Sequence, residues 1–284
     1  MQLPPADHVY GLSAEDPRVA HLWEQVEMPP VENGSIKTIN FGGGAMLLDL
    51  DPVSERFIDF SASCCLPVLD IGCAYGIATL PALERTSSAV IANDICPEHL
   101  VLIAKQAAPE ARSRLFLAAK KFPEEVDFPE NSLGAVLMSR VLHFLRGEDI
   151  EKGFEKIAKW LAPGGKLFII TATPYQKPIQ DLISLYEERW EQGDPWPGYI
   201  PDYAQRNGYD NLFPFLNVMD ERPLKKSLEK AKLVMESTEF VDRQNTVPRI
   251  ALDGREGIGV VAIKPFLKPQ KANSPHRIQA KAWQ

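Results

Sequence analysis

The chain has 284 residues, of which 45% are hydrophobic and 24% are charged, and its formal net charge is −7. These proportions exclude wholesale disorder, collagen-like repeats and a coiled coil. No stretch approaches the ~20 apolar residues that are needed to cross a bilayer, and the first residues lack the basic and apolar regions of a secretory signal. We therefore expect a cytoplasmic protein without a membrane partner.

The charge and the cysteines argue against further kinds of partner and binding site. With 31 basic against 38 acidic residues, the chain lacks the overall basic character of a nucleic-acid-binding protein. The four cysteines (64, 65, 73 and 96) show no Cys-x-x-Cys spacing and no nearby histidine cluster, so neither a disulfide framework nor a structural zinc site is expected. We predict reduced thiols, no metal site and no nucleic-acid partner.

Residues 1–60 are predicted to form an N-terminal extension or cap. Residues 21–23 fit a short helix that stops before Pro29. Two strand-like stretches flank the sequence FGGG at 41–44, which predicts a hairpin with a glycine-rich turn. No helix pattern follows these glycines, so a turn is favoured over a phosphate-binding loop.

Between residues 61 and 265, short apolar runs alternate with helical segments, as they do in parallel α/β folds. The apolar runs predict strands at 66–71, 89–93, 114–118, 134–138, 166–172, 233–240 and 257–263. Helices are predicted to about residue 85, from Pro97 onward, along an apolar stripe from 150 to 161, and at 223–232. This alternation predicts one α/β domain.

Residues 173–222 break this rhythm with six prolines and nine aromatic residues, and a helix is predicted at 178–191. We interpret the stretch as an insertion that forms a substrate lid. Residues 175–222 hold four basic and nine acidic residues, which does not suit nucleic acid, whereas aromatic walls suit a flat or apolar small molecule. The alternative is that these aromatics build the core of a small helical cap. Residues 266–284 are predicted to be a flexible basic tail.

The segment that carries chemistry is VLDIGCAYG at 68–76. A buried strand ends near Asp70, Gly72 permits a tight turn and the close approach of a ligand, and a helix is expected to open at Gly76. The amino end of that helix would favour an anion. Asp94 ends the second strand, where a carboxylate can accept hydrogen bonds from both hydroxyls of a ribose.

Two classes of cofactor compete for this pattern. A dinucleotide site uses G-x-G-x-x-G, whose loop meets a pyrophosphate, whereas this chain has D-x-G-x-x-x-G. A carboxylate ahead of the first glycine would repel a pyrophosphate but suits a ligand with an ammonium group. S-adenosyl-L-methionine carries an ammonium, a carboxylate and a ribose, so the spacing favours this methyl donor.

Four features occur in order: VLDIGCAYG, the strand IANDI, SRVLHFL after the fourth strand, and LAPGGKLFII before the fifth. With them the sequence resembles the class I S-adenosylmethionine-dependent methyltransferases over roughly residues 60–263. The resemblance implies a methyltransferase with a seven-stranded, mostly parallel Rossmann-like sheet, an antiparallel last strand and helices on both faces. Many relatives carry acids after the third strand and before the fourth, where this chain has AAKK at 118–121 and LG at 133–134.

The resemblance also implies roles for single residues in holding the cofactor. Asp70 would lie near the methionine ammonium, Asp94 would hold the ribose, and Ile95 would pack on the adenine. The remaining residues implied for the cofactor site are Gly72, Cys73, Ala74, Gly76 and Ser139.

For the acceptor side, His143 is the candidate catalytic base, because its unperturbed pKa near 6.5 suits proton transfer. The alternative is that His143 only packs beside its neighbours in a helix. Arg140 is a candidate for steering an anionic acceptor, or for a structural ion pair. The aromatic candidates for the acceptor pocket are Tyr175, Trp190, Trp196 and Tyr199.

Three functions follow from this reading. The first is transfer of a methyl group to an oxygen or nitrogen of a small-molecule acceptor by in-line displacement. The second is methylation of a protein or peptide, with the acidic insertion attracting a basic substrate. The third is a non-catalytic protein that binds S-adenosylmethionine and acts in regulation.

Overall fold

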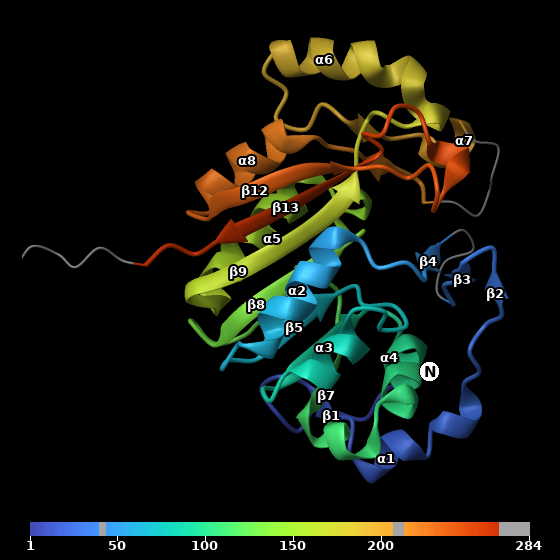
Figure 1. Cartoon of the computed structure of the whole chain (residues 1–284), viewed down its shortest axis with the longest axis vertical. Helices are drawn as coiled ribbons and strands as arrows, with labels where there is room; N and C mark the ends of the chain where they lie inside the picture. Colours follow the sequence, from blue (N-terminus) through green and yellow to red (C-terminus); the bar gives the residue numbers. More distant parts are fainter. Residues whose placement is uncertain (40–43, 207–212, 267–284) are drawn as a thin grey trace, which may run out of the picture.

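The computed structural model describes residues 1–39, 44–206 and 213–266. Its centre is an eight-stranded sheet in the order β1-β7-β6-β5-β8-β9-β13-β12 (Figure 1). The strands of this sheet are β1 (Leu12–Ser13), β5 (Val68–Ile71), β6 (Val90–Asp94), β7 (Leu115–Ala119), β8 (Leu133–Ser139), β9 (Leu161–Ala172), β12 (Val234–Val241) and β13 (Gly257–Ile263). Strands β5 to β9 run parallel, and β13 is antiparallel to both β9 and β12. The predicted α/β sheet is confirmed, and β1, antiparallel to β7, exceeds the predicted count of seven.

Helices cover both faces of the sheet. One face packs against α2 (Pro52–Ala62), α3 (Thr79–Arg85) and α4 (Pro97–Gln106), and the other packs against α5 (Gly147–Trp160) and α8 (Glu221–Lys230) (Figure 1). All four residues of β5 are buried, because a central parallel strand has no face toward water. Val68 packs with the α2 side and Leu69 with the α5 side, as the alternation of strand side chains requires. The carboxyl ends of β5, β6 and β8 therefore meet at one edge of the sheet.

Helix α5 follows the predicted apolar stripe and ends one residue before the predicted limit. Ile150, Phe154 and Ile157 are fully buried, and Trp160 completes the stripe. The indole Nε1 of Trp160 donates to Asp127 at 2.9 Å, so its one polar atom is satisfied. Amphipathic periodicity alone was therefore enough to predict this helix and its inward face.

The N-terminal residues do more than cap the domain. They contain α1 (Pro17–Ala20), η1 (Trp23–Gln25) and a small sheet of β2 (Val31–Glu32), β3 (Ser35–Lys37) and β4 (Ala45–Leu47). The predicted hairpin is confirmed by the pairing of β3 with β4, and residues 40–43 of its turn lie outside the described residues. Helix α2 crosses the boundary predicted at residue 60 and packs on the sheet. Its start is capped by Asp51 and followed by Pro52, a signal that the sequence does contain.

The insertion after β9 is a small unit of its own, at the top of Figure 1. It contains η4 (Lys177–Leu182), α6 (Ile183–Glu191), β10 (Tyr199–Ile200), α7 (Tyr203–Arg206) and β11 (Leu216–Asn217), and β10 pairs with β11. The predicted helix over 178–191 is interrupted, because Ile179 has non-helical dihedral angles. Tyr209 and the predicted basic tail from residue 267 lie outside the described residues.

Three further 3₁₀ turns connect the main elements: η2 (Pro109–Arg114), η3 (Leu142–Phe144) and η5 (Pro248–Ile250). Turn η3 follows β8 and η5 lies between β12 and β13, so both belong to the connections at the carboxyl edge of β8 and β9. Within the described residues, no helix is long and apolar enough to cross a bilayer.

Candidate active site

The glycine loop after β5 makes the tight turn that its sequence predicts, but the helix after it begins later than expected. Gly72, Ala74 and Gly76 all have positive φ, at 69°, 45° and 81°. A Cβ on Gly72 would lie 2.4 Å from the Val141 side chain, so only glycine fits beneath the loop that follows β8. The helix does not open at Gly76 as expected: α3 begins at Thr79, because the left-handed residues prolong the turn.

Asp70 lies at the base of this loop. Its side chain is buried and accepts a hydrogen bond from the Thr79 hydroxyl at 2.7 Å. Burial, with a smaller contribution from Asp94, raises the pKa of Asp70 to about 7. The carboxyl group is therefore divided between its neutral and charged forms near neutral pH, and a nearby ammonium group would favour the charged form.

Asp94 ties the loop after β5 to the start of α4. One carboxylate oxygen accepts from the amide of Ala74 at 2.9 Å, and the other accepts from the amide of Cys96 at 2.8 Å. The Nδ1 atom of His99 lies 3.2 Å from Asp94 Oδ1. A carboxylate offers about four lone-pair positions, so these two amides leave acceptor capacity for a ligand. Asp94 thus positions the glycine loop as well as presenting a carboxylate at the sheet edge.

The other predicted cofactor residues lie around the same edge. Ile95 is 46% exposed directly after Asp94, which leaves an apolar surface beside that carboxylate. Ser139 is the last residue of β8 and lies half-buried at the rim. Cys73 is buried, and burial raises the pKa of its thiol well above the ordinary value, so the thiol stays protonated.

A cavity of about 670 Å³ is lined by residues next to this loop: Lys37 accepts a hydrogen bond from the Tyr75 hydroxyl, and Arg140 precedes Val141, which packs on Gly72. Its walls come from the β2–β4 sheet, the segment after β8, the end of β9, the insertion and the connection between β12 and β13. Its volume lies within the ~300–1,000 Å³ range of small-molecule sites. None of the residues from Gly72 to Gly76 lines it, so the cavity is distinct from the glycine loop.

His143 lines this cavity, and its Nδ1 lies 3.3 Å from the hydroxyl of Thr171. Burial, with smaller contributions from the nearby charges of Arg140 and Arg243, lowers the pKa of His143 to about 3. The imidazole is therefore neutral at physiological pH and is a weak base while the cavity holds no negative charge.

We expect His143 to remain neutral from pH 8 down to pH 5 in the folded protein. Imidazole ¹⁵N chemical shifts, assigned by comparison with His143→Gln, measure this directly. In the unfolded chain His143 binds a proton as the pH falls through about 6.5, whereas in the folded state it stays neutral. Protonation of His143 therefore favours unfolding increasingly as the pH falls below 6.5. An inflection of the His143 signals between pH 5.5 and 7.5 would contradict the expected burial.

Arg140 and Arg243 place two cationic groups on the wall of the cavity. Arg140 follows β8 and has a φ of 60°, a left-handed conformation that is rare for a long side chain. Its Nη2 lies 3.4 Å from Asp51, without a hydrogen bond. Arg243 is 7% exposed, and burial and the neighbouring Arg140 lower its pKa to about 10.

The backbone that carries Arg243 is held by Glu256. One carboxylate oxygen of Glu256 accepts from the amides of Leu252, Asp253 and Gly254, and the other accepts from the amide of Arg243 at 3.0 Å. These hydrogen bonds lower the pKa of Glu256 to about 2, although burial opposes them. The Glu256 charge is therefore engaged with backbone amides.

None of the four aromatic residues predicted for the acceptor pocket lines this cavity. Tyr175 contacts Glu187 and Asp220, Trp190 packs on Arg222, and Trp196 packs over the start of α5 at Gly147. They build the insertion and attach it to the domain, as the alternative interpretation held. The insertion instead gives the cavity Gln176, Tyr203, Phe213 and Leu216.

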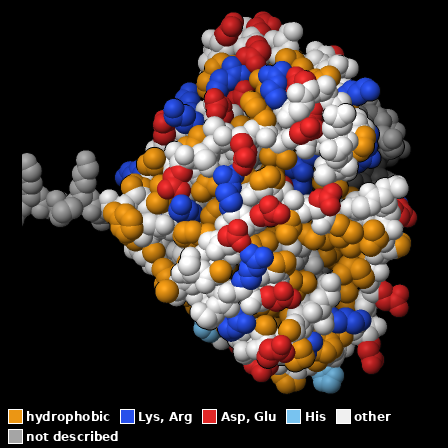
Figure 2. Space-filling model, in the orientation of Figure 1, with side chains coloured by type: hydrophobic (Ala, Val, Ile, Leu, Met, Phe, Trp, Pro, Cys, Tyr) orange, Lys and Arg blue, Asp and Glu red, His pale blue; other side chains and the backbone are white. Residues whose placement is uncertain are grey.

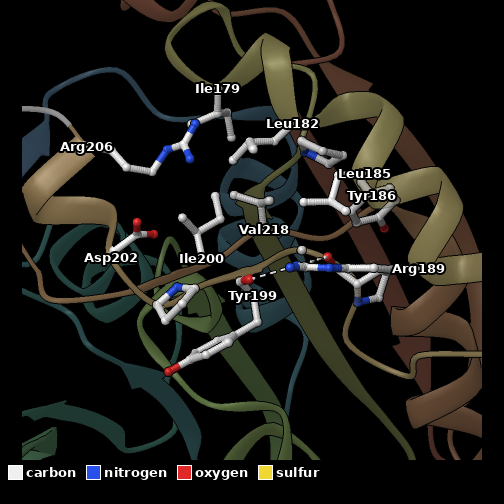
Figure 3. Close-up of a pocket in the computed structure, with 14 residues that line it drawn as sticks. Ile179, Leu182, Leu185, Tyr186, Arg189, Tyr199, Ile200, Asp202, Arg206 and Val218 are labelled. Carbon is white, nitrogen blue, oxygen red and sulfur yellow. Dashed lines mark hydrogen bonds between the residues drawn. The ribbon is translucent and has the colours of Figure 1, made fainter.

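Tyr199 lines a second, smaller pocket of about 70 Å³ inside the insertion. Ile179, Leu182, Ile200 and Val218 turn toward one another there (Figure 3). Arg189 closes one side by donating to the carbonyl of Tyr199 at 3.1 Å. The pocket is the space left within the insertion's own apolar core, and it lies apart from the glycine loop.

Sequence patterns missed the residues of the β12–β13 connection. Arg243, Thr246 and Glu256 stand more than 100 residues after Arg140, in a stretch without a recognisable motif. His99 was also missed: it is 1% exposed, and its Nε2 accepts from the amide of Ile39 at 3.2 Å. That contact attaches the N-terminal residues to α4, and the hydrogen bond from the Tyr75 hydroxyl to the carbonyl of Lys37 at 2.6 Å attaches them to the glycine loop.

Comparisons with known proteins agree with this geometry. Residues 68–165 match the family described as "Methyltransferase domain". Phosphoethanolamine N-methyltransferase 1 of Triticum aestivum is 29% identical over 102 residues, which is 36% of this chain and 20% of that protein. The chain therefore matches one fifth of the length of this curated relative.

Solved structures share the fold at low sequence identity. A SAM-dependent methyltransferase from Methanosarcina mazei has a TM-score of 0.56 at 17% identity, covering 77% of this chain and 100% of that one. The 1,6-didemethyltoxoflavin-N1-methyltransferase of Burkholderia thailandensis, with bound 1,6-didemethyltoxoflavin and S-adenosylhomocysteine, has a TM-score of 0.51 at 18% identity, covering 76% and 77%. The family match thus covers the glycine loop and Asp94, and the whole α/β domain shares the fold of solved SAM-dependent methyltransferases.

Proposed function

We propose that this protein transfers a methyl group from S-adenosyl-L-methionine to an oxygen or nitrogen of a small molecule held in the 670 Å³ cavity. The observation that carries the proposal is the position of this cavity beside a glycine loop flanked by two buried carboxylates, Asp70 and Asp94. A cavity of this size suits a small acceptor better than a protein surface. The bound 1,6-didemethyltoxoflavin of the Burkholderia methyltransferase is a precedent for a small acceptor on this fold.

The residues at the sheet edge fit the cofactor. Asp94 retains acceptor capacity for the ribose hydroxyls, and the exposed side chain of Ile95 offers an apolar face for the adenine. Asp70 supplies a carboxylate for the methionine ammonium.

S-adenosylmethionine, when bound, supplies a methyl group already activated on a sulfonium. The protein's part is then to align the acceptor and to remove its proton, with the nucleophile about 3–3.5 Å from the methyl carbon. Arg140, His143 and Phe144 line the cavity, so an acceptor held there lies beside the segment after β8. We assign His143 to receive the proton, because its neutral ring lines the cavity and its Nδ1 lies beside the Thr171 hydroxyl.

The test is a binding and turnover measurement on the purified protein. We expect isothermal titration calorimetry to give a dissociation constant for S-adenosylmethionine in the micromolar range, about −8 kcal/mol. We also expect S-adenosylhomocysteine to accumulate with a small-molecule metabolite extract. Turnover only with protein fractions would favour a protein substrate, binding without any turnover would favour a regulatory role, and no binding would contradict the proposal.

A further inference from the structure

The wall of the large cavity gathers polar side chains that have no hydrogen-bond partner among the described residues, although Arg140 lies 3.4 Å from Asp51. The buried Nη2 of Arg140 and the buried hydroxyl of Thr246 make no hydrogen bond. The guanidinium of Arg243 also donates to none of the described residues, although the side chain is 7% exposed. A buried polar group without a partner costs about 1–3 kcal/mol, and more when it is charged. Such a cluster lowers the stability of the folded protein unless a ligand accepts its hydrogen bonds.

The nearby carboxylates do not satisfy these guanidiniums. Asp51 caps α2, and its oxygens accept from the amides of Val53 and Ser54 and from the Ser54 hydroxyl, the last at 3.0 Å. Glu256 accepts from four backbone amides. Both acids offset positive charge in the region, but the donors of the two arginines remain available.

On the premise of the proposed function, we infer that the methyl acceptor carries an oxyanion, a carboxylate or phosphate, that binds to Arg140 and Arg243 inside the cavity. A guanidinium presents five N–H donors in a planar fork that matches these oxyanions with two parallel hydrogen bonds. The Thr246 hydroxyl adds a neutral donor on the same wall. Arg140 also has a left-handed backbone conformation, and such strained residues cluster at sites that bind ligands.

The charge of the protein surface supports an anionic small molecule rather than a macromolecule. In Figure 2 the Lys and Arg side chains on the visible face are interspersed with Asp and Glu, without an extended basic area. The guanidiniums of Arg140 and Arg243 instead lie on the cavity wall, in a chain of net charge −7. An oxyanion there also offsets the positive charge that lowers the pKa of His143.

The test measures anion binding separately from methyl transfer. Protein saturated with S-adenosylhomocysteine is titrated calorimetrically with benzoate, with phenyl phosphate and with benzamide, which is a neutral match for benzoate. We expect at least one anion to bind 10-fold or more tightly than benzamide. Whichever anion binds more tightly identifies the preferred oxyanion, and both results support the inference.

The variants Arg140→Gln and Arg243→Gln are expected to abolish this preference, whereas Arg85→Gln, on the exposed surface of α3, retains it. Since neither cavity guanidinium donates a hydrogen bond within the described protein, we expect the melting temperature of both variants to stay level or rise. S-adenosylhomocysteine affinity is expected to change less than threefold.

Three results would overturn the inference. Equal binding of the anions and benzamide by wild type would remove the oxyanion site while leaving the proposed function intact. A selective loss of S-adenosylhomocysteine binding in the arginine variants would assign the guanidiniums to the cofactor's own carboxylate. Unfolding of both variants at room temperature would show that the arginines hold the fold. Failure of wild type to bind S-adenosylhomocysteine contradicts the proposed function instead, and the anion titrations can still be performed on the unsaturated protein.

Discussion

Replacing Asp94 by asparagine is expected to weaken S-adenosylmethionine binding by about 100-fold or more. A hydrogen bond to a charged group contributes about 1.5–3 kcal/mol, and the ribose would donate two to this carboxylate. The asparagine amide also brings an N–H₂ donor toward the amide of Ala74 or of Cys96, which both donate to Asp94. The substitution therefore disturbs the glycine loop in addition to removing charge.

Isothermal titration calorimetry with S-adenosylhomocysteine measures the loss, and thermal melting tests whether the variant remains folded. Asp59→Asn is the matched control, because Asp59 lies on α2 with 69% of its side chain exposed. A dissociation constant within threefold of wild type would show that Asp94 serves the loop and not the cofactor.

Replacing Glu256 by glutamine is expected to lower the free energy of unfolding by about 3 kcal/mol at pH 7. Glu256 is 1% exposed and accepts four backbone hydrogen bonds from the segment that carries Arg243. The glutamine N–H₂ group cannot accept, so at least one of these buried amides loses its partner, at about 1–3 kcal/mol, and the charge that strengthens the others is lost.

The same substitution should remove a pH-dependent part of the stability. The pKa of Glu256 is lowered to about 2 in the folded state from an ordinary value near 4.5, so its stabilisation is fully present above pH 4.5 and is lost as the pH falls toward 2. Urea denaturation at pH 7 and pH 3 should therefore show a smaller difference between wild type and Glu256→Gln at the lower pH. Glu236→Gln, a partly exposed residue of β12, is the control. An equal difference at both pH values would contradict a charged Glu256.

The role of Asp94 could be predicted from the sequence in part, whereas that of Glu256 could not. Asp94 ends a predicted strand at a fixed interval from the glycine loop, so its place at the sheet edge followed from the pattern. Its oxygens accept hydrogen bonds from the amides of Ala74 and Cys96, which belong to two different turns, and only the structure showed these bonds. Glu256 had no signal in the sequence, because its partners form a loop without regular periodicity.

The aromatic residues of the insertion show the same division. Their number correctly indicated a unit outside the α/β pattern, but composition cannot say which side of an aromatic ring faces a ligand. Trp190 packs on Arg222, whereas Phe144 of the turn after β8 lines the cavity. The direction of each side chain depends on how the insertion docks on the domain, which is a property of long-range contacts.

The amino-acid sequence by itself determined the α/β class, the mostly parallel sheet with an antiparallel last strand that the family resemblance implied, and the glycine loop. Those features depend on short-range periods and on glycines and acids at fixed spacing, which a linear pattern records. The length, composition and acidic net charge excluded general classes of protein but gave no information about the cavity. Only the tertiary structure brought Arg140 and Arg243 to the same cavity wall. Their proximity arises because β8 and the β12–β13 connection end at the same edge of the sheet, more than 100 residues apart in the chain.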